Sequence, residues 1–478
     1  MAEAIGAGQP RAVGGPRAVT GAPAASGLGQ WSWALFEWAR NPYVILVTIY
    51  LFAPYFTNHV VGDPVRGQVV WGRINGWSGI ATALFAPILG AIADSGGRRK
   101  PWIAFFVTVM APTSWLLWFA LPEQQGLSIA WIGFMLIANS AAFEYSAVFH
   151  NAMLPSIAPR ERIGFLSGLG LAAGNASSLL ILVFMLCAFS LPGNVDWSFI
   201  PDHALFGLDT AAHQQDRITG PIAAVWLLAF GIPLFLFTPD RTPGSLGALE
   251  AVRAGLRQLV HTIRELRSYR NVAAYLVARM IFNDGMTAVL VFGGVYAAGV
   301  FGWDSLTMTV FGIVLSVFAV FGGLVGGWLD DTLGSKRALM VSIGGTSLGL
   351  VLAVSISPDE LFFAIPWDRA APKVWSLPFF NTVPELLYIG VVTLIAVSIT
   401  AAYANSRTML ARIAPPEMMT EFFGIYSLSG TSVAWIGSFT VQAFTNAFRS
   451  QRIGFASILI FMVLGLVGMA FVREERTA

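Results

Sequence analysis

The sequence predicts an all-α membrane protein with twelve transmembrane helices, arranged as two six-helix bundles related by pseudo-two-fold symmetry. Three observations predict this class. Of the 478 residues, 56% are hydrophobic and only 11% are charged, whereas a soluble domain carries about 25% charged residues. Apolar segments of membrane length recur along the whole chain. A polar turn of one pattern occurs once in each half, which indicates a duplicated membrane protein.

The individual spans follow from length, because a helix needs about 20 mostly apolar residues to cross a bilayer. Glycines in the fifth and eighth spans give small-residue faces that suit close helix contact; they are Gly168, Gly170, Gly174, Gly322, Gly323, Gly326 and Gly327. The predicted spans are 31–57, 70–93, 101–121, 128–154, 163–191, 218–238, 271–299, 306–329, 338–357, 385–413, 422–447 and 453–472.

The distribution of basic residues predicts the direction of these spans. Most of the 28 Lys and Arg residues fall on one side of the membrane if both termini are cytoplasmic, as the positive-inside tendency requires. This places the long loops 193–217 and 358–383 outside. The expected divisions are a flexible cytoplasmic tail (1–30), an N-terminal bundle (31–238), a cytoplasmic linker (239–270), a C-terminal bundle (271–472) and a second cytoplasmic tail (473–478).

The linker 239–270 has apolar residues at helical spacing with arginines among them. This pattern is typical of an amphipathic helix lying on the membrane surface, although a plain basic linker accounts for the same residues. The N-terminal tail is rich in Ala, Gly and Pro without an apolar segment, so we expect a flexible tail and no cleavable signal peptide.

The repeated turn follows the pattern Gly-x-x-x-Asp-x-x-Gly, with basic residues next to it. The aspartate can accept hydrogen bonds from a neighbouring helix start and pair with a nearby arginine, and the first glycine permits close helix approach. A tight turn that merely obeys the positive-inside tendency is the alternative. The first copy comprises Gly90, Asp94, Gly97, Arg98 and Arg99, and the second comprises Gly327, Asp331, Gly334 and Lys336.

Twelve spans with this turn in both halves resemble the major facilitator superfamily. Further segments resemble its vacuole-effluxer branch, also called the unknown major facilitator family, whose fungal members are implicated in exporting amino acids from vacuoles. These segments are 33–43 (WALFEWARNPY), 154–159 (LPSIAP), 165–170 (FLSGLG), 282–285 (FNDG), 405–407 (NSR), 413–415 (IAP) and 421–427 (EFFGIYS). The resemblance implies that the turns latch the cytoplasmic side, and that spans 1, 4, 7 and 10 surround a central pathway.

The ionisable residues well inside the spans occur only in spans 1, 4, 7 and 10. A central Arg, Lys or Asp costs about 2.5–3.5 kcal/mol on insertion scales, so such residues normally face a cavity or a partner. We expect Glu144 or Asp284 to exchange a proton, while Arg279 or Arg407, with Asn283 nearby, binds a substrate carboxylate or other anion. Glu144, Arg279 and Asp284 are expected nearest mid-bilayer, and Arg407 toward the cytoplasm. Structural neutralisation between helices is the alternative. The expected pathway or cytoplasmic gate residues are Glu37, Arg40, Asn41, Tyr145, His150, Asn151 and Tyr403.

Spacing refines this set. Glu37, Arg40 and Asn41 stand at i, i+3 and i+4, so they share a helix face and can pair locally. Glu144 and Asn151, seven residues apart, also share a face. His150 is a candidate pH-sensitive group, because a histidine side chain ordinarily changes charge near neutral pH, and a hydrogen-bonded core histidine is the alternative.

These features predict a secondary active transporter that moves a small polar solute by alternating access, coupled to protons. An amino acid or related zwitterion or organic anion is the first substrate guess. An uncoupled facilitator or exporter of amphipathic compounds is one alternative, and a non-transporting scaffold or ligand sensor is another. We expect no enzyme activity, metal, cofactor or nucleic-acid partner, because the chain has no ATP-binding loop, no Cys/His pattern and one cysteine. We expect a monomer in a cell (inner) membrane, if the source is bacterial.

Overall fold

The computed structural model describes most of the chain between residues 17 and 474. Outside the description lie 1–16, 19, 95–96, 160–161, 196–197, 241–249, 251–252, 254–256, 258–263, 265, 267, 415–421, 423–424, 427–428, 431–432 and 475–478. The predicted amphipathic linker helix falls largely on these residues, as do parts of the eleventh span.

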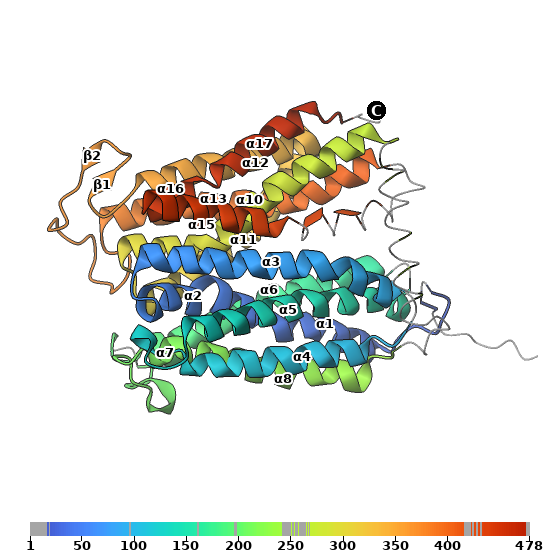
Figure 1. Ribbon diagram of the computed structural model, residues 1–478, viewed down its shortest axis with the longest axis horizontal. Coiled ribbons are helices and arrows are strands. Elements are labelled where there is room, and N and C mark those ends of the chain that lie inside the picture. Colours follow the sequence, from blue (N-terminus) through green and yellow to red (C-terminus); the bar gives the residue numbers. More distant parts are fainter. Residues whose placement is uncertain are drawn as a thin grey trace, which may run out of the picture.

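The N-terminal bundle is built from six long helical segments (Figure 1). Its first span is a broken helix, with Pro42 at the end of α1 and π-helical turns after it. The segments are α1 (Gly27–Pro42) continued by η1 (Tyr43–Tyr50), α2 (Phe52–Tyr55) and η2 (Phe56–Val60); α3 (Pro64–Asp94); α4 (Lys100–Leu116) with η3 (Leu117–Phe119); α5 (Ile129–Ile157); α6 (Ile163–Met185) with η5 (Leu186–Ser190); and α7 (Gln214–Arg217) followed by α8 (Thr219–Phe237).

The C-terminal bundle repeats this plan. A small antiparallel hairpin, β1 (Glu360–Leu361) with β2 (Ile365–Pro366), lies in the long loop predicted over residues 358–383. The helices are α10 (Arg270–Phe301), α11 (Ser305–Leu333), α12 (Ser335–Ser355), α13 (Val383–Ile413), α15 (Ala434–Phe448), and α16 (Gln451–Ala456) followed by α17 (Leu459–Phe471).

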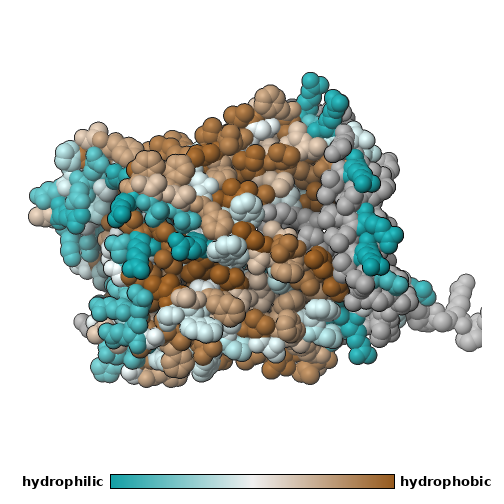
Figure 2. All heavy atoms as spheres, in the orientation of Figure 1, coloured by the Kyte–Doolittle hydropathy of each residue, from teal (hydrophilic) through white to brown (hydrophobic). Residues whose placement is uncertain are grey.

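Ten helices in the described residues are long and apolar enough to cross a membrane. The other two predicted spans correspond to α3, which has 31 residues, and to the region that ends with α15. On the face that Figure 2 shows, a broad apolar band lies between two polar ends, as expected for a protein that crosses a bilayer.

The two polar ends of the molecule differ in what they carry. The loops around 193–217 and 358–383 lie at one end, on the left of Figure 1, which we call the loop end. The end of α8 and the start of α10, which flank the linker 239–270 in sequence, lie at the other, which we call the linker end. The described chain begins and finishes at the linker end (Figure 1).

The segment before α1 departs from the predicted flexible tail 1–30. Its backbone is hydrogen-bonded to the end of α5, with Ala25 N donating to Ile157 O at 2.9 Å and Thr20 N to Pro155 O at 3.3 Å. The Ser26 side chain then caps α1. The expectation is therefore wrong for the described residues from 17 onward, because these backbone groups find partners that sequence composition does not reveal.

The two bundles meet through their loop-end halves. There α3 packs along α15: a Cβ placed on Gly72 would lie 2.7 Å from Gln442 Cβ. The bundles are hydrogen-bonded from Gln68 Nε2 to Thr445 Oγ1 at 2.8 Å and from Gln451 Nε2 to Pro64 O at 2.9 Å. Among the residues that the structure describes, every hydrogen bond between the bundles lies toward the loop end, and none joins them at the linker end.

Candidate functional site

The predicted central charges fall into two separate clusters, one in each bundle. The α1–α5 cluster comprises Glu37, Arg40, Glu144 and His150. The α10 cluster comprises Arg279, Asn283 and Asp284. No ion pair in the described part of the chain joins one cluster to the other. Among these predicted central charges, as far as the structure describes them, pairing between helices, the structural alternative, is seen only inside the N-terminal bundle.

Glu37 and Arg40 form the local pair that their spacing predicts. The two Glu37 carboxylate oxygens accept from Arg40 Nη2 at 2.9 Å and from Arg40 Nε at 3.0 Å. Arg40 also donates from Nη1 to Phe143 O at 3.2 Å, and its guanidinium lies 4.4 Å from the centre of the Phe143 ring. The guanidinium thus connects α1 to α5 and has little contact with solvent.

His150 is fully buried between α1 and its own helix α5. Its Nε2 lies 2.8 Å from Trp33 O, and Trp33 Nε1 donates to His150 O at 2.9 Å. The two rings are stacked, with centres 4.4 Å apart. On its other edge, His150 Nδ1 lies 3.3 Å from Glu37 Oε1. The histidine is therefore an internal member of the cluster.

The remaining predicted residues of the N-terminal bundle differ in how they relate to Glu37 and Arg40. Glu144 is half-buried and close enough to Arg40 and Glu37 to interact with them electrostatically. Asn41 packs against α6, since a Cβ on Gly174 would lie 2.7 Å from Asn41 Nδ2. Tyr145 donates its hydroxyl to Ala81 O at 2.5 Å. Asn151 is exposed, so the shared face predicted with Glu144 does not bring it into the cluster.

Arg279 is a buried charged side chain of the C-terminal bundle. It is 6% exposed, and Nη1 donates to Tyr426 O at 2.7 Å and to Ser429 Oγ at 2.6 Å. The guanidinium lies 3.4 Å from the centre of the Tyr426 ring. No carboxylate in the described residues is within ion-pair distance of it, and its Nε has no partner among them. A buried positive charge is thus held by neutral groups.

The other predicted residues of this bundle are divided between the α10 cluster and the surface. Asp284 is 1% exposed; one oxygen accepts from Gly437 N at 2.8 Å and the other has no partner in the described residues. Asn283 Nδ2 donates to Gly430 O at 3.4 Å. Tyr403 is half-buried and within electrostatic reach of Arg279. Arg407 is exposed on α13, and its predicted substrate-binding role stays a prediction.

The first repeated turn places Arg99, not Arg98, in the interior. Arg99 is 4% exposed and donates to Ala93 O from Nε at 3.2 Å and to Ser156 Oγ from Nη1 at 2.9 Å. Arg98 is exposed. The Asp94 side chain lies outside the described residues, so its predicted latch role stays a prediction.

The second turn differs from the sequence expectation in its acid. Asp331 is exposed, whereas its neighbour Asp330 is 8% exposed. Asp330 accepts from Ser335 Oγ at 2.5 Å and pairs with Arg412 Nη2 at 2.7 Å. The rotation of α11 against α13 selects Asp330, because Gly326 lies directly on α13: a Cβ there would be 2.8 Å from Ala401 Cα.

Close approach at the first glycine of each turn is also not seen. No described atom lies within 4 Å of the position that a Cβ would take at Gly90 or Gly327. The glycine faces predicted in the fifth and eighth spans do make close contacts, at Gly170 and Gly174 on α6 and at Gly322 and Gly326 on α11.

Two carboxylates that sequence reasoning missed cap the helices that follow the repeated turns, one carboxylate for each helix. Asp240 accepts from Arg99 N and Lys100 N, both at 3.0 Å, at the start of α4. Glu474 accepts in the same way from Ser335 N at 2.9 Å and Lys336 N at 3.1 Å, at the start of α12. A carboxylate there satisfies free N–H groups and the positive end of the helix dipole.

Lys100 and Lys336, at the starts of α4 and α12, make equivalent contacts in the two bundles. Lys100 Nζ donates to Phe235 O at 3.0 Å and Lys336 Nζ to Ala470 O at 3.1 Å, so each lysine also caps the carboxyl end of the last helix of its bundle. The signal that could have found these residues is positional: each acid comes shortly after the sixth span of its half. Arg412, which pairs with both Asp330 and Glu474, was also missed.

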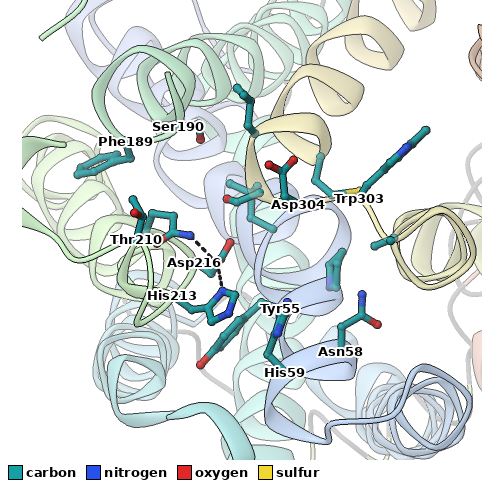
Figure 3. Close-up of a pocket in the computed structure, with 18 of the residues that line it drawn as sticks. Tyr55, Asn58, His59, Phe189, Ser190, Thr210, His213, Asp216, Trp303 and Asp304 are labelled. Atoms are coloured by element: carbon teal, nitrogen blue, oxygen red, sulfur yellow. Dashed lines mark hydrogen bonds and ion pairs between the residues drawn. The ribbon is translucent and has the colours of Figure 1, made fainter. Parts of the chain in front are cut away.

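A cavity of about 530 Å³ opens at the loop end between the two bundles (Figure 3). The His213 ring is 3.9 Å from the His59 ring, centre to centre, and His213 Nδ1 lies 3.3 Å from Asp216 Oδ2. The lining includes no Lys or Arg; its polar residues are Asn58, His59, Ser190, Asn194, Thr210, His213, Gln215, Asp216, Asp304 and Ser305. Sequence reasoning found no site in these outer loops, because they show no periodic pattern.

The cavity floor adjoins the contact between bundles. Leu51 and Met308 line the cavity, and the neighbouring Tyr50 ring meets the Phe311 ring edge to face with centres 5.9 Å apart. A Cβ on Gly312 would be 2.9 Å from the Tyr50 ring. These contacts belong to the same loop-end interface that joins the bundles.

Comparisons with known proteins agree on one family and one fold. A family model described as "Vacuole effluxer Atg22 like" matches residues 160–478. The chain is similar to YxiO of Bacillus subtilis (strain 168), described as an uncharacterized MFS-type transporter, with 23% identity over 449 residues, 93% of this chain and 94% of that protein. Autophagy-related protein 22 of Yarrowia lipolytica is 20% identical over 474 residues, covering 81% of this chain and 72% of that protein.

Solved structures share the architecture at low sequence identity. A D-xylose-proton symporter matches with a TM-score of 0.62 and 12% identity, covering 93% of this chain and 96% of that one. An inward open conformation of the xylose transporter XylE from E. coli matches with a TM-score of 0.58 and 12% identity, covering 94% and 96%. The predicted fold class, twelve transmembrane helices in two bundles, is confirmed.

Proposed function

This chain belongs to the vacuole effluxer Atg22-like family and is a membrane transporter of the major facilitator type; from this premise we propose that it moves a small polar solute with a carboxylate group by alternating access, coupled to protons. An amino acid or a related zwitterion or organic anion is the substrate class. The observation that carries the proposal is the buried guanidinium of Arg279, which has no carboxylate partner in the described residues.

Burial of the Arg279 guanidinium has a cost in free energy. Removing a guanidinium from water costs several kcal/mol unless an anion and further hydrogen bonds compensate it. Here two neutral acceptors and one aromatic face bind the guanidinium, and Nε is free among the described residues. An arginine in a purely structural role gains from a permanent carboxylate partner. An arginine that binds and releases a substrate carboxylate must keep that position available.

Asp284 supports coupling to protons. It lies five residues from Arg279 on α10, without an ion-pair partner in the described part of the chain and with one unpartnered oxygen. A carboxyl group in such a place is a suitable site for taking up and releasing a proton. A proton symporter is among the structures of the same fold. Glu144 is the corresponding carboxyl group of the N-terminal bundle.

Alternating access is supported by where the bundles touch. They are hydrogen-bonded toward the loop end, and no hydrogen bond of the described residues joins them at the linker end. With the linker end in the cytoplasm, as the positive-inside tendency favours, this arrangement corresponds to an inward-facing state. Opening of the loop-end interface would connect the outer cavity with the central charges.

The test is flux in proteoliposomes with an imposed pH gradient and a panel of solutes. We expect gradient-dependent flux of a carboxylate-bearing solute, which Arg279→Met abolishes. The matched control is Arg369→Ala, which removes an exposed arginine of the loop end. Flux that is indifferent to the pH gradient would support the uncoupled facilitator instead. Absence of flux for every solute, with folded protein, would contradict a transport function.

A further inference from the structure

We propose that His150 and Glu37 together form a proton-binding site inside the N-terminal bundle, in which the proton sits on His150 Nδ1 against the Glu37 carboxylate. The inference deepens the proposed function and rests on it for the link to transport. The proposed site is additional to Asp284 and Glu144. Without the second ring proton, His150 is an ordinary hydrogen-bonded core histidine.

The partner of Nε2 decides which ring nitrogen of a neutral His150 carries the hydrogen. Nε2 of His150 lies 2.8 Å from the backbone oxygen of Trp33. A carbonyl oxygen can only accept, so Nε2 must carry a hydrogen and donate it. In a neutral imidazole only one nitrogen carries hydrogen, and Nδ1 is then an acceptor with an outward lone pair.

The other ring nitrogen of His150, Nδ1, lies beside a carboxylate. Its neighbour at 3.3 Å is Glu37 Oε1, and a carboxylate oxygen is also an acceptor. With a neutral ring, the lone pair of Nδ1 lies beside a carboxylate oxygen inside the protein, at ion-pair distance but outside hydrogen-bond geometry. A second ring proton changes this contact into an attraction between an imidazolium and a carboxylate, which a small reorientation of Glu37 completes as a charge-assisted hydrogen bond. The charges at this distance therefore favour the protonated ring.

The ring cannot easily avoid this contact by rotating. It is fully buried, stacked on Trp33 with 12° between the ring planes, and has Phe36 at 5.0 Å, centre to centre. Trp33 Nε1 also donates to His150 O, so the two residues are joined in both directions. A change of protonation is thus transmitted to the contact between α1 and α5 as attraction or repulsion.

The charges around His150 come from few elements. From α1 it faces Glu37 and Arg40, and on its own helix Glu144 is about 9 Å away along the axis, six residues earlier. Within the described parts of the chain, the other packed helices contribute Arg66, Arg73 and Asp94 on α3, Lys100 on α4, and none on α6 or α8. Buried Arg99, just before α4, donates to Ser156 near the end of α5. Arg17, in the segment packed on the end of α5, is exposed.

These neighbours suggest a balanced exchange. Arg40 already compensates Glu37 with two hydrogen bonds, so a proton on His150 adds one net positive charge to the cluster. Glu144, half-buried and electrostatically linked to both Glu37 and Arg40, can balance that charge when it is ionised. The proton can thus reside on Glu144 with His150 neutral, or on His150 with Glu144 charged.

The position of α1 connects this site to alternating access. The same span continues through η1 into the loop-end interface, where Tyr50 meets Phe311 of the other bundle. A proton that holds α1 against α5 therefore acts on the helix that also closes the loop end. Loss of that proton would release α1 from α5 and permit the interface to rearrange.

The experiment has two measurements. Nitrogen-15 NMR of the histidine rings in lipid nanodiscs, with His150→Gln identifying the signal by its absence, reports whether both ring nitrogens are protonated. Proteoliposome assays compare gradient-driven accumulation with solute exchange at equal pH. For His150→Gln and Glu37→Gln we expect the ratio of accumulation to exchange to fall about tenfold or more, equivalent to about 1.4 kcal/mol of coupling. His203→Gln, an exposed loop histidine, is the control.

The outcomes separate this inference from the proposed function. A doubly protonated His150 ring near pH 6 in the wild type, with loss of coupling in both variants, supports it. A His150 ring that stays neutral between pH 5 and pH 8 overturns it, as does full gradient-driven accumulation in both variants. If the wild type transports no solute, the proposed function fails, while the NMR result still decides whether the proton site exists. Glu37→Gln serves if His150→Gln does not fold.

Discussion

Replacing Arg40 by methionine should destabilise the N-terminal bundle in a way that depends on pH. The substitution removes two hydrogen bonds to Glu37, at 2.9 and 3.0 Å, and one to Phe143 O at 3.2 Å. Removing one partner of a buried ion pair costs about 3–5 kcal/mol. Because 19% of the Glu37 side chain stays exposed and His150 remains beside it, we expect a loss of about 2–3 kcal/mol in the free energy of unfolding.

The pH dependence has a definite sign. The proton that we propose on His150 supplies a second positive partner for Glu37, and on that proposal the loss caused by Arg40→Met should be smaller at pH 5 than at pH 8. The assay is equilibrium unfolding in mixed micelles for the wild type, Arg40→Met, Glu37→Gln and the double variant. The cycle should give a coupling energy of about 1–2 kcal/mol at pH 8. A coupling energy near zero, or a loss that grows as the pH falls, would refute the reasoning.

Three further predictions concern the linker end, the glycine faces and the outer loop. Asp330→Asn should lower the free energy of unfolding by about 1–3 kcal/mol because Asp330 pairs with Arg412, whereas Asp331→Asn should change it by less than about 0.5 kcal/mol; equal effects would contradict the assigned register. Gly326→Val should cost about 1–3 kcal/mol because its Cβ would meet Ala401 at 2.8 Å, and Gly323→Val, with no described atom within 4 Å, is its control in thermal unfolding. Hydrogen bonding from Arg369 holds the pKa of Asp359 below its usual value, so Arg369→Ala should raise that pKa in a carbon-13 carboxyl titration, and an unchanged titration would show that the pair does not form.

The helices were predictable because their lengths and local pairs depend on nearby residues. Apolar segments of membrane length located the spans, and the spacing of Glu37 and Arg40 predicted their ion pair before any tertiary contact was known. The glycine faces of α6 and α11 were predictable for the same reason, although only some of their members make close contacts.

The residues that were missed depend on how helices distant in sequence are placed. Asp330 and Asp331 are adjacent, and only the rotation of α11 against α13 decides which of them meets Arg412. Asp240 and Glu474 cap helices that begin more than a hundred residues earlier. Arg407, predicted from its place inside the tenth span, is exposed on α13, and only the packing of that helix decides this.

The central claim is that Arg279 binds the carboxylate of the substrate, and a comparison of stability with ligand binding tests it most directly. The measurement is the thermal unfolding of the wild type and of Arg279→Met, each with and without the transported solute. Without solute, the variant should be about as stable as the wild type, because the removed charge has no carboxylate partner among the described residues. The solute should stabilise only the wild type, by an amount that rises with the logarithm of its concentration above the Kd. Equal stabilisation of both proteins would contradict the claim.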